Sequence, residues 1–168
     1  MNIFILDEDP RQAARDLCNK HVPKMLVESA QLICTGLSIN GVAKEHLLYK
    51  PTHTHHPCSL WVSQHQSNAA WLWEHADELS IEYTCRYNKI HKTSMVLEQM
   101  KQFKPDVNWC DHTTFVQAMP DQYKNSCAVD AYRAYYIAEK AKFAKWLPRA
   151  NSPDWWPFEE QSNAAHVE

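Results

Sequence analysis

A carboxylate and an amine stand one helical turn apart in the first quarter of the chain. Lys24 and Glu28 are four residues apart, and helical spacing places them on one face with Gln31 and Thr35. A carboxylate beside an amine can act as an acid/base pair in catalysis. The same spacing is also typical of a solvated surface ion pair, so the pattern alone leaves both interpretations open.

Three histidines and a cysteine crowd a second short stretch. Of these, His53, His56 and Cys58 form a weak candidate zinc set, because imidazole nitrogens and thiolates are the usual zinc ligands. A closed structural zinc site needs a fourth ligand, which Cys110 or His112 would have to supply. A polar loop leading into a helix is the simpler interpretation, and we expect the chain to need no cofactor.

A helix must position the Lys24–Glu28 pair. Pro23 suits the first turn of a helix, where its missing N–H needs no partner, and Gly36 is a plausible stop. The opposite side of this helix carries an apolar stripe at helical spacing. The stripe consists of Leu26, Ala30, Ile33 and Leu37.

The whole composition favours an all-α fold. The chain has 168 residues with 45% hydrophobic residues, and only 2 Gly stand against 9 Pro, whereas strand-rich folds usually need more turn glycines. We therefore expect one compact helical bundle with long loops over residues 1–168. Helical spacing predicts further helices over 10–18, 57–87 with a break at 67–68, 93–103 and 128–147, with loops over 38–54 and 104–124 and a loosely ordered tail over 150–168.

The net charge is −3, so any contact with nucleic acid must use a local patch rather than a bulk polycation. The candidates for phosphate or polar contacts are Arg86, Lys92, Lys124 and Arg133. The six cysteines form no CxxC pair, no signal peptide is visible, and no apolar run is long enough to cross a membrane. We expect a cytoplasmic protein, in the host cytoplasm if the chain is viral, without a membrane or protein partner.

Several stretches resemble the pyrimidine-dimer DNA glycosylases of the phage endonuclease V type. Leu17, His21 and Glu28 match the spacing at the start of that family. The segment MPDQYK, a helix and then KWLPRANSPDWW resemble its C-terminal half. The middle, with HPCSLW and WLWEHADELSIEYTCRYNKIHK, is similar to uncharacterised phage and bacterial relatives.

The resemblance implies an endonuclease V-like helical fold, DNA as the partner and an amine nucleophile. In that family the α-amine of the mature chain attacks the sugar C1′ and expels the base, and an imine forms before β-elimination nicks the strand. The α-amines as a class have a pKa of about 7.7–8.0, which leaves a useful unprotonated fraction near neutrality. By position the catalytic residues are Met1 and Glu28, with Lys24 as the reserve nucleophile, and His21, Gln31 and His56 are candidate pocket residues.

The chain departs from the family pattern at three positions. The family has a small second residue that allows removal of the initiator methionine, whereas Asn2 stands here. Val27 and Gln31 replace arginines that grip DNA in the family glycosylase. A helical binding protein that holds a nucleotide or nucleic acid without chemistry therefore remains the alternative to an enzyme.

Overall fold

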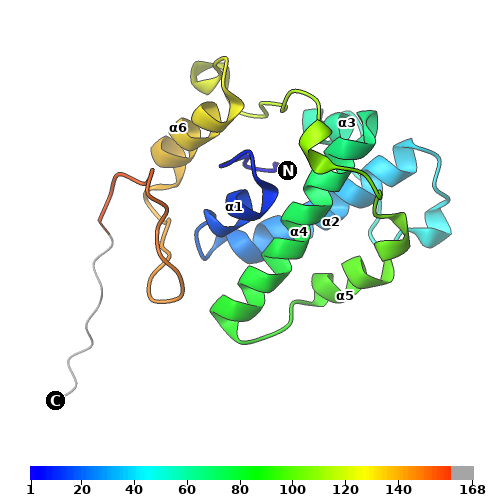
Figure 1. Cartoon of the computed structure of the whole chain (residues 1–168), viewed down its shortest axis with the longest axis horizontal. Coiled ribbons are helices and arrows are strands. Elements are labelled where there is room, and N and C mark those ends of the chain that lie inside the picture. Colours follow the sequence, from blue (N-terminus) through cyan, green and yellow to red (C-terminus); the bar gives the residue numbers. More distant parts are fainter. Residues whose placement is uncertain (160–168) are drawn as a thin grey trace.

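The protein is an assembly of helices built on the packing of α2, which spans His21–Ile39, against α4 (Figure 1). The computed structural model describes residues 1–159, and within that range it contains no β-strand. Helices α3, α4 and α5 all pack against α2, and α1 packs against α4. The all-α prediction is therefore confirmed. The other α-helices are α1 (Pro10–Arg15), α3 (Pro57–Gln64), α4 (Gln66–Tyr87), α5 (Lys92–Gln99) and α6 (Ala128–Lys140).

Local side-chain caps fix where the helices begin. The Asp9 carboxylate accepts hydrogen bonds from the backbone N–H groups of Arg11 (2.7 Å) and Gln12 (3.3 Å), which satisfies two free donors of α1. The break between α3 and α4 falls at His65, two residues before the predicted position. His65 adopts an extended backbone, and its Nδ1 accepts from the backbone N–H of Ser67 at 3.2 Å. An imidazole nitrogen thus caps α4 where a serine or asparagine was expected.

Helix α6 ends at Lys140 rather than near Leu147, although the apolar period continues beyond it. Past the helix, the chain turns back onto the α1–α2 connection, where Lys145 O accepts from Asn19 N at 2.8 Å and Trp146 Nε1 donates to Asp16 O at 3.1 Å. Periodicity predicts which side chains are buried. It does not show that the backbone has left the helix to bury them.

The segment expected to be a loose tail packs onto the same region as far as it is described. Trp155 Nε1 donates to Asp16 Oδ2 at 2.6 Å, and Trp156 is only 8% exposed. The remainder of the predicted tail, 160–168, lies outside the described residues. Within residues 1–159 no helix is long and apolar enough to span a membrane.

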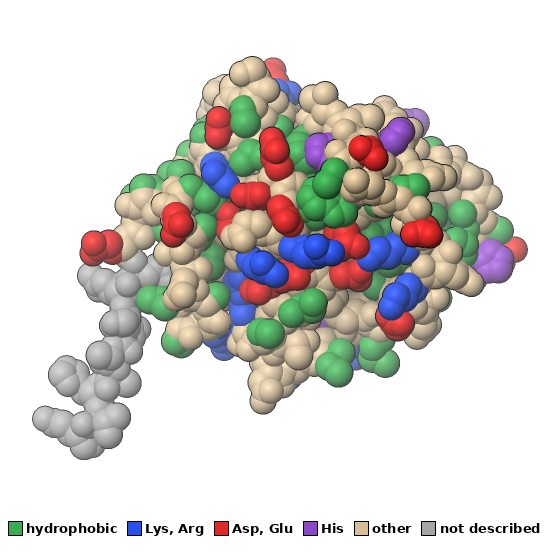
Figure 2. Space-filling view, in the orientation of Figure 1, with side chains coloured by type: hydrophobic (Ala, Val, Ile, Leu, Met, Phe, Trp, Pro, Cys, Tyr) green, Lys and Arg blue, Asp and Glu red, His purple; other side chains and the backbone are tan. Residues whose placement is uncertain are grey.

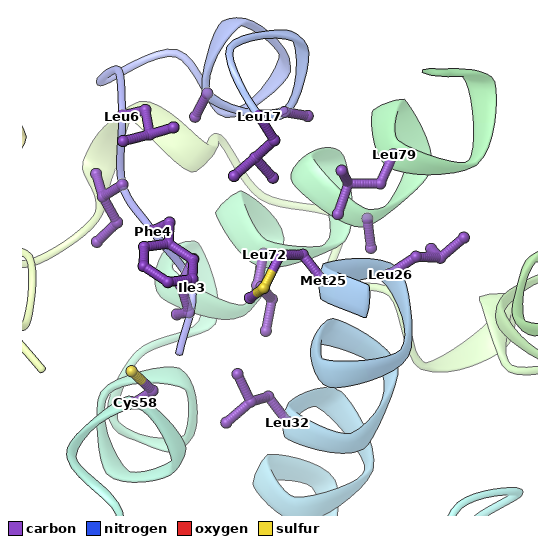
Figure 3. Packing of buried hydrophobic residues seen from close by; sticks show 14 of the residues in the cluster. Ile3, Phe4, Leu6, Leu17, Met25, Leu26, Leu32, Cys58, Leu72 and Leu79 are labelled. Atoms are coloured by element: carbon purple, nitrogen blue, oxygen red, sulfur yellow. The ribbon is translucent and has the colours of Figure 1, made fainter. Parts of the chain in front are cut away.

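The N-terminal segment is threaded through the core rather than lying on it. Ile3, Phe4, Ile5 and Leu6 are each between 0% and 5% exposed. Figure 3 shows Ile3 and Phe4 among the buried side chains of α2, α3 and α4, and the ring of Phe4 contacts His21 and Tyr136. Full burial of one such apolar side chain contributes about 1.5–3 kcal/mol. This packing fixes the backbone that leads to Met1.

Candidate active site

The first two residues of the chain meet the carboxylate of Glu28. The backbone N–H of Asn2 donates to Glu28 Oε2 at 2.8 Å, and the amine nitrogen of Met1 lies 4.0 Å from the same oxygen. On the other side, Lys24 Nζ lies 3.7 Å from Glu28 Oε1. The structure thus brings Met1, Lys24 and Glu28 together, three residues that the sequence singled out.

This site is sheltered but not sealed. The side chain of Glu28 is 16% exposed and that of Met1 is 4% exposed, whereas Lys24 is 59% exposed. A lysine forms imines readily only when burial disfavours its ammonium form, and Lys24 is both exposed and paired with a carboxylate. The structure therefore does not provide the condition under which Lys24 would act as the reserve nucleophile.

His56 and Cys58, at the start of α3, border the same site. The Nδ1 of His56 accepts from the backbone N–H of Cys58 at 3.2 Å, so in the neutral ring the proton sits on Nε2. Burial lowers the pKa of His56, and the positive charge at the N-terminus of Met1 lowers it further, while Glu28 opposes the shift. His56 therefore lies within electrostatic range of the Met1 amine and of Glu28. Gln31, one turn beyond Glu28 on α2, is half-buried.

The candidate zinc set is not assembled. His53 Nδ1 is hydrogen-bonded to the Thr52 hydroxyl at 2.8 Å, and His56 Nδ1 caps α3. Burial raises the pKa of the Cys58 thiol to about 12, which disfavours the thiolate that zinc binds. Within residues 1–159 no group of three or more His, Cys, Asp or Glu side chains is arranged to hold a metal ion.

His21 lies behind the site rather than in an open pocket. It is 4% exposed, its ring stacks on Phe4 at 5.1 Å, and its Nδ1 is hydrogen-bonded to the hydroxyl of Tyr136 at 2.7 Å. Burial, followed by the positive charges of three lysines, lowers the pKa of His21 to about 4. The neutral His21 ring therefore packs against Phe4 and holds the N-terminal segment in place. The three lysines are Lys24, Lys140 and Lys20.

These three lysines, which we name the lysine face, adjoin the site, and two of them lie against aromatic rings. Lys20 Nζ is 4.8 Å from the centre of the Phe143 ring, and Lys140 Nζ is 4.9 Å from that of Tyr135. Within the described part of the chain, Lys20 and Lys140 have no carboxylate partner. Their positive charge is therefore available to an anionic ligand.

Several other cations of the described chain are neutralised by acids. Figure 2 shows one face of the molecule on which Lys and Arg side chains alternate with Asp and Glu side chains. Helix α4 supplies acids to several of these ion pairs, including Glu74 to Arg11 and Lys104, and Glu78 to Arg15. A face of paired charges offers little attraction to phosphate.

Arg86 has a structural role instead of the predicted phosphate contact. Its side chain is 1% exposed, and Nε donates to Glu82 at 2.7 Å. Nη1 donates to Leu17 O (2.6 Å) and Asn19 Oδ1 (3.3 Å), and Nη2 donates to Arg15 O (2.8 Å) and pairs with Glu82. All five N–H donors therefore have partners within the chain, and none is left for a ligand. Lys92 is exposed at the start of α5, and no contact joins it to the Glu28 site.

Arg133 and Lys124 are also engaged within the chain. Arg133 Nε donates to Leu6 O at 2.7 Å and Nη2 to Asp7 at 3.1 Å, which ties α6 to the N-terminal segment. Lys124 pairs with Asp121 at 2.7 Å on the surface. The structure does not bring either residue to Glu28.

Sequence reasoning missed Asn2, Lys20 and Lys140 as candidate site residues. Lys20 and Lys140 stand 120 positions apart, so only the fold shows that both approach His21. For Asn2 a signal was present, because the apolar run after it predicts a buried N-terminal segment, and a polar residue at its start must find partners.

The geometry consists of an amine beside a sheltered glutamate and, next to them, a cationic and aromatic surface. The sequence model of the family described as pyrimidine dimer DNA glycosylase matches residues 1–95, a stretch that contains Met1, Lys24, Glu28 and His56. No curated protein and no solved structure matches the chain. The family match covers more than half of the 168 residues and agrees with the resemblance seen in the sequence. The chain belongs to the pyrimidine dimer DNA glycosylase family.

Proposed function

We propose that the protein is a DNA glycosylase that excises a damaged or modified pyrimidine base, with the amine of Met1 as nucleophile and Glu28 as acid/base residue. The observation that carries this proposal is the 4.0 Å separation of the Met1 nitrogen from Glu28 Oε2 inside a sheltered site. An amine can form a covalent imine with a sugar carbon, and a neighbouring carboxylate can move the protons that this requires.

The proposed reaction begins when the amine nitrogen bonds to C1′ of the deoxyribose and the bond from C1′ to the base breaks. The base leaves with a proton, and Glu28 stabilises the positive charge that develops on the sugar. Opening of the sugar ring gives an imine between the nitrogen and C1′. Loss of a C2′ proton then breaks the C3′–O bond, which nicks the strand and gives the protein its lyase activity.

The lysine face supports DNA as the ligand. Lysines held beside aromatic rings suit nucleic acid, because the ammonium groups contact phosphates while rings can stack on unpaired bases. Lys24 belongs to this face and also pairs with Glu28, so a strand bound there passes directly over the carboxylate. A base rotated out of the duplex would then bring its C1′ within reach of the amine.

Strand incision tests the proposal. The wild-type protein and Glu28→Gln are incubated with an ultraviolet-irradiated duplex, a duplex with one abasic site and an undamaged duplex. We expect the wild type to incise the irradiated and abasic duplexes only, and the variant to incise neither. Glu98→Gln, on the surface of α5, serves as the charge-matched control. Tight DNA binding without any product would instead favour a binding protein on the same fold.

A further inference from the structure

The side chain of Asn2 ties the first residues of the chain to a distant loop. Its Nδ2 donates to the backbone oxygen of Ala118 at 2.8 Å. Its Oδ1 accepts from the backbone N–H groups of Ile3 (2.8 Å) and Phe4 (3.3 Å), which closes a turn at the start of the chain. One carboxamide thus fixes the direction in which the backbone leaves the core toward Met1.

The loop that receives Asn2 is itself held in place. The hydroxyl of Tyr132, on α6, donates to Val116 O at 3.1 Å and accepts from Ala118 N at 3.1 Å. Tyr132 is fully buried, so this anchor is rigid. The position of the Ala118 carbonyl, and with it the position of Asn2, is therefore set by α6.

Phe4 shows that the turn is imposed by its surroundings. It has a φ of 56°, a left-handed conformation that a bulky residue adopts only when its surroundings hold it there. Its ring is held by stacking on His21 at 5.1 Å and by an edge contact with Tyr136 at 5.4 Å. Strained backbone of this kind is concentrated at functional sites, and here it lies three residues from Met1, whose nitrogen faces Glu28.

We propose that the nucleophile is the amine of a retained Met1, and that Asn2 is the positioning residue that holds this amine against Glu28. The inference rests on the proposed function. Removal of the initiator methionine requires a small second residue, and Asn2 is not small. The Met1 side chain is 4% exposed and packs against the core, so Met1 is an integral part of the site. The Asn2 nitrogen, as an amide, then orients the carboxylate by donating to Glu28 Oε2.

The test must distinguish the amine of Met1 from that of residue 2 as the nucleophile. If Met1 were removed, the nitrogen of Asn2, 2.8 Å from Glu28 Oε2, would become the free amine. Asn2→Ser creates that situation, because a small second residue permits removal of Met1. Asn2→Leu has the same branched shape as asparagine with somewhat larger end groups, keeps Met1 and removes every hydrogen bond of the carboxamide.

The experiment measures borohydride trapping on a duplex with a preformed abasic site, under single-turnover conditions with excess protein. Each protein carries its purification tag at the C-terminus, and mass spectrometry identifies its first residue and maps the adduct. The rate constant reports the position of the amine, and the adduct amplitude of a parallel reaction with excess duplex, in which the protein is limiting, reports the fraction of folded protein. Fluorescence anisotropy measures the affinity for the same duplex separately. Asn40→Leu is the matched control, because its carboxamide donates to Ser63 O at 3.2 Å at the far end of α2.

We expect a wild-type adduct on the α-amine of Met1. A misplacement of about 1 Å can cost about 100-fold in rate, so Asn2→Leu should slow trapping by about 10- to 100-fold. Its amplitude and DNA affinity should stay near those of the wild type, which a loss of folding would not allow. Tyr132→Phe should slow trapping less but in the same direction, Asn2→Ser should trap slowly, and Asn40→Leu should leave the rate constant unchanged.

Three results would overturn the inference while leaving in place a DNA glycosylase that uses some amine nucleophile. The first is a wild-type adduct mapped to residue 2 or to a lysine. The second is Asn2→Leu trapping as fast as the wild type. The third is Asn2→Ser trapping as fast as the wild type through its new terminal amine. Absence of any adduct with folded wild-type protein would remove the proposed function itself, and this inference with it.

Discussion

Glu28 is the residue on which the proposed chemistry depends most directly, because it contacts both Asn2 and Lys24 and faces the Met1 nitrogen. Glu28→Gln keeps the shape of the side chain but cannot take up or release a proton. Acid/base groups typically contribute 100-fold or more to a rate. We therefore expect incision of an abasic duplex to fall by at least about 100-fold.

Binding separates this effect from a loss of structure. The affinity of Glu28→Gln for the abasic duplex, measured by fluorescence anisotropy, should equal or exceed that of the wild type, because the variant removes a negative charge near the phosphates. Incision that survives in Glu28→Gln would show that another group carries the chemistry. Lost binding would show that the residue shapes the DNA surface.

His75 makes a prediction about stability and pH. It is fully buried, stacks on Trp71 at 5.3 Å, and neither ring nitrogen has a hydrogen-bond partner among residues 1–159. Burial lowers its pKa to about 3. The unfolded chain, with an ordinary histidine pKa of about 6.5, binds a proton first as the pH falls. The stabilising contribution of His75 is therefore complete above pH 6.5 and declines as the pH falls toward 3.

His75→Phe keeps an aromatic ring on Trp71 and removes this proton. Between pH 6.5 and 4.5 one such histidine accounts for about 2 kcal/mol of lost stability. Urea titration measures the free energy of unfolding of both proteins at pH 6.5 and at pH 4.5. We expect the loss between these two pH values to be smaller in the variant than in the wild type, by the contribution of this one histidine. Equal pH dependence in the two proteins would contradict this account of His75. His21, whose pKa is also lowered, supplies part of the slope that remains.

At the level of single residues, sequence reasoning identified the pair of Lys24 and Glu28, but it assigned phosphate contacts to cations that the fold uses for internal contacts. The four-residue spacing of Lys24 and Glu28 correctly placed them together. Arg86 was assigned to phosphate from its charge, although Glu82 four residues earlier indicated an internal partner. Charge alone does not show whether a side chain is buried, and whether these residues act as proposed awaits the experiments above.

The crossing of α2 and α3 carries the element-scale prediction, because α3 places His56 beside Glu28. A Cβ atom at Gly36 would lie 3.0 Å from Cγ1 of Val62, so the helices approach closely only because residue 36 has no side chain. Gly36→Ala gains up to about 1 kcal/mol in helix propensity but overpacks the crossing, which typically costs about 1–3 kcal/mol. We expect a net loss of about 1 kcal/mol in the free energy of unfolding.

A double-mutant cycle checks the physical reason. Val62→Ala creates room at the crossing, so in that background Gly36→Ala should be neutral or stabilising in urea titration. If Gly36→Ala costs the same in both backgrounds, the contact with Val62 is not the cause. A cost only in the wild-type background would confirm that Gly36 sets the distance between the two helices.

The start of a helix was predictable where a capping residue and a proline mark it in the sequence. Asp9 with Pro10, and His56 with Pro57, each mark a helix start through a cap and a proline in the first turn. The end of α6 was not predictable, because Phe143 and Trp146 continue the apolar period after the backbone has turned back on itself. A long-range contact, not a local signal, ends that helix.

At the scale of the whole molecule, the distribution of charge matters more than its sum. The chain is acidic overall, yet several of its acids, such as those of α4, are engaged in ion pairs, whereas Lys20 and Lys140 have no carboxylate partner in residues 1–159. Because these lysines are not paired with acids, an acidic protein can still present a local positive surface to DNA. It could not be predicted from sequence, because it depends on which charges the fold brings together.

The salt dependence of DNA binding tests this surface. Each phosphate contact contributes about 0.9 to the slope of log affinity against log salt concentration. The double variant Lys20→Gln, Lys140→Gln should bind an undamaged duplex more weakly and lower that slope by up to about 1.8. Lys92→Gln, an exposed lysine on α5, is the matched control and should leave both quantities unchanged. Weaker binding and a smaller slope for Lys92→Gln, with no change in the double variant, would show that DNA binds at α5 instead.

The most direct measurement is covalent trapping of the wild-type protein. The protein is mixed with an abasic duplex and, separately, with an undamaged duplex; borohydride reduces any imine, and mass spectrometry maps the adduct. The proposed mechanism predicts a single adduct on the α-amine of Met1, formed with the abasic duplex alone. Folded protein that binds the abasic duplex but gives neither adduct nor incision would contradict the amine mechanism and leave a binding protein in its place.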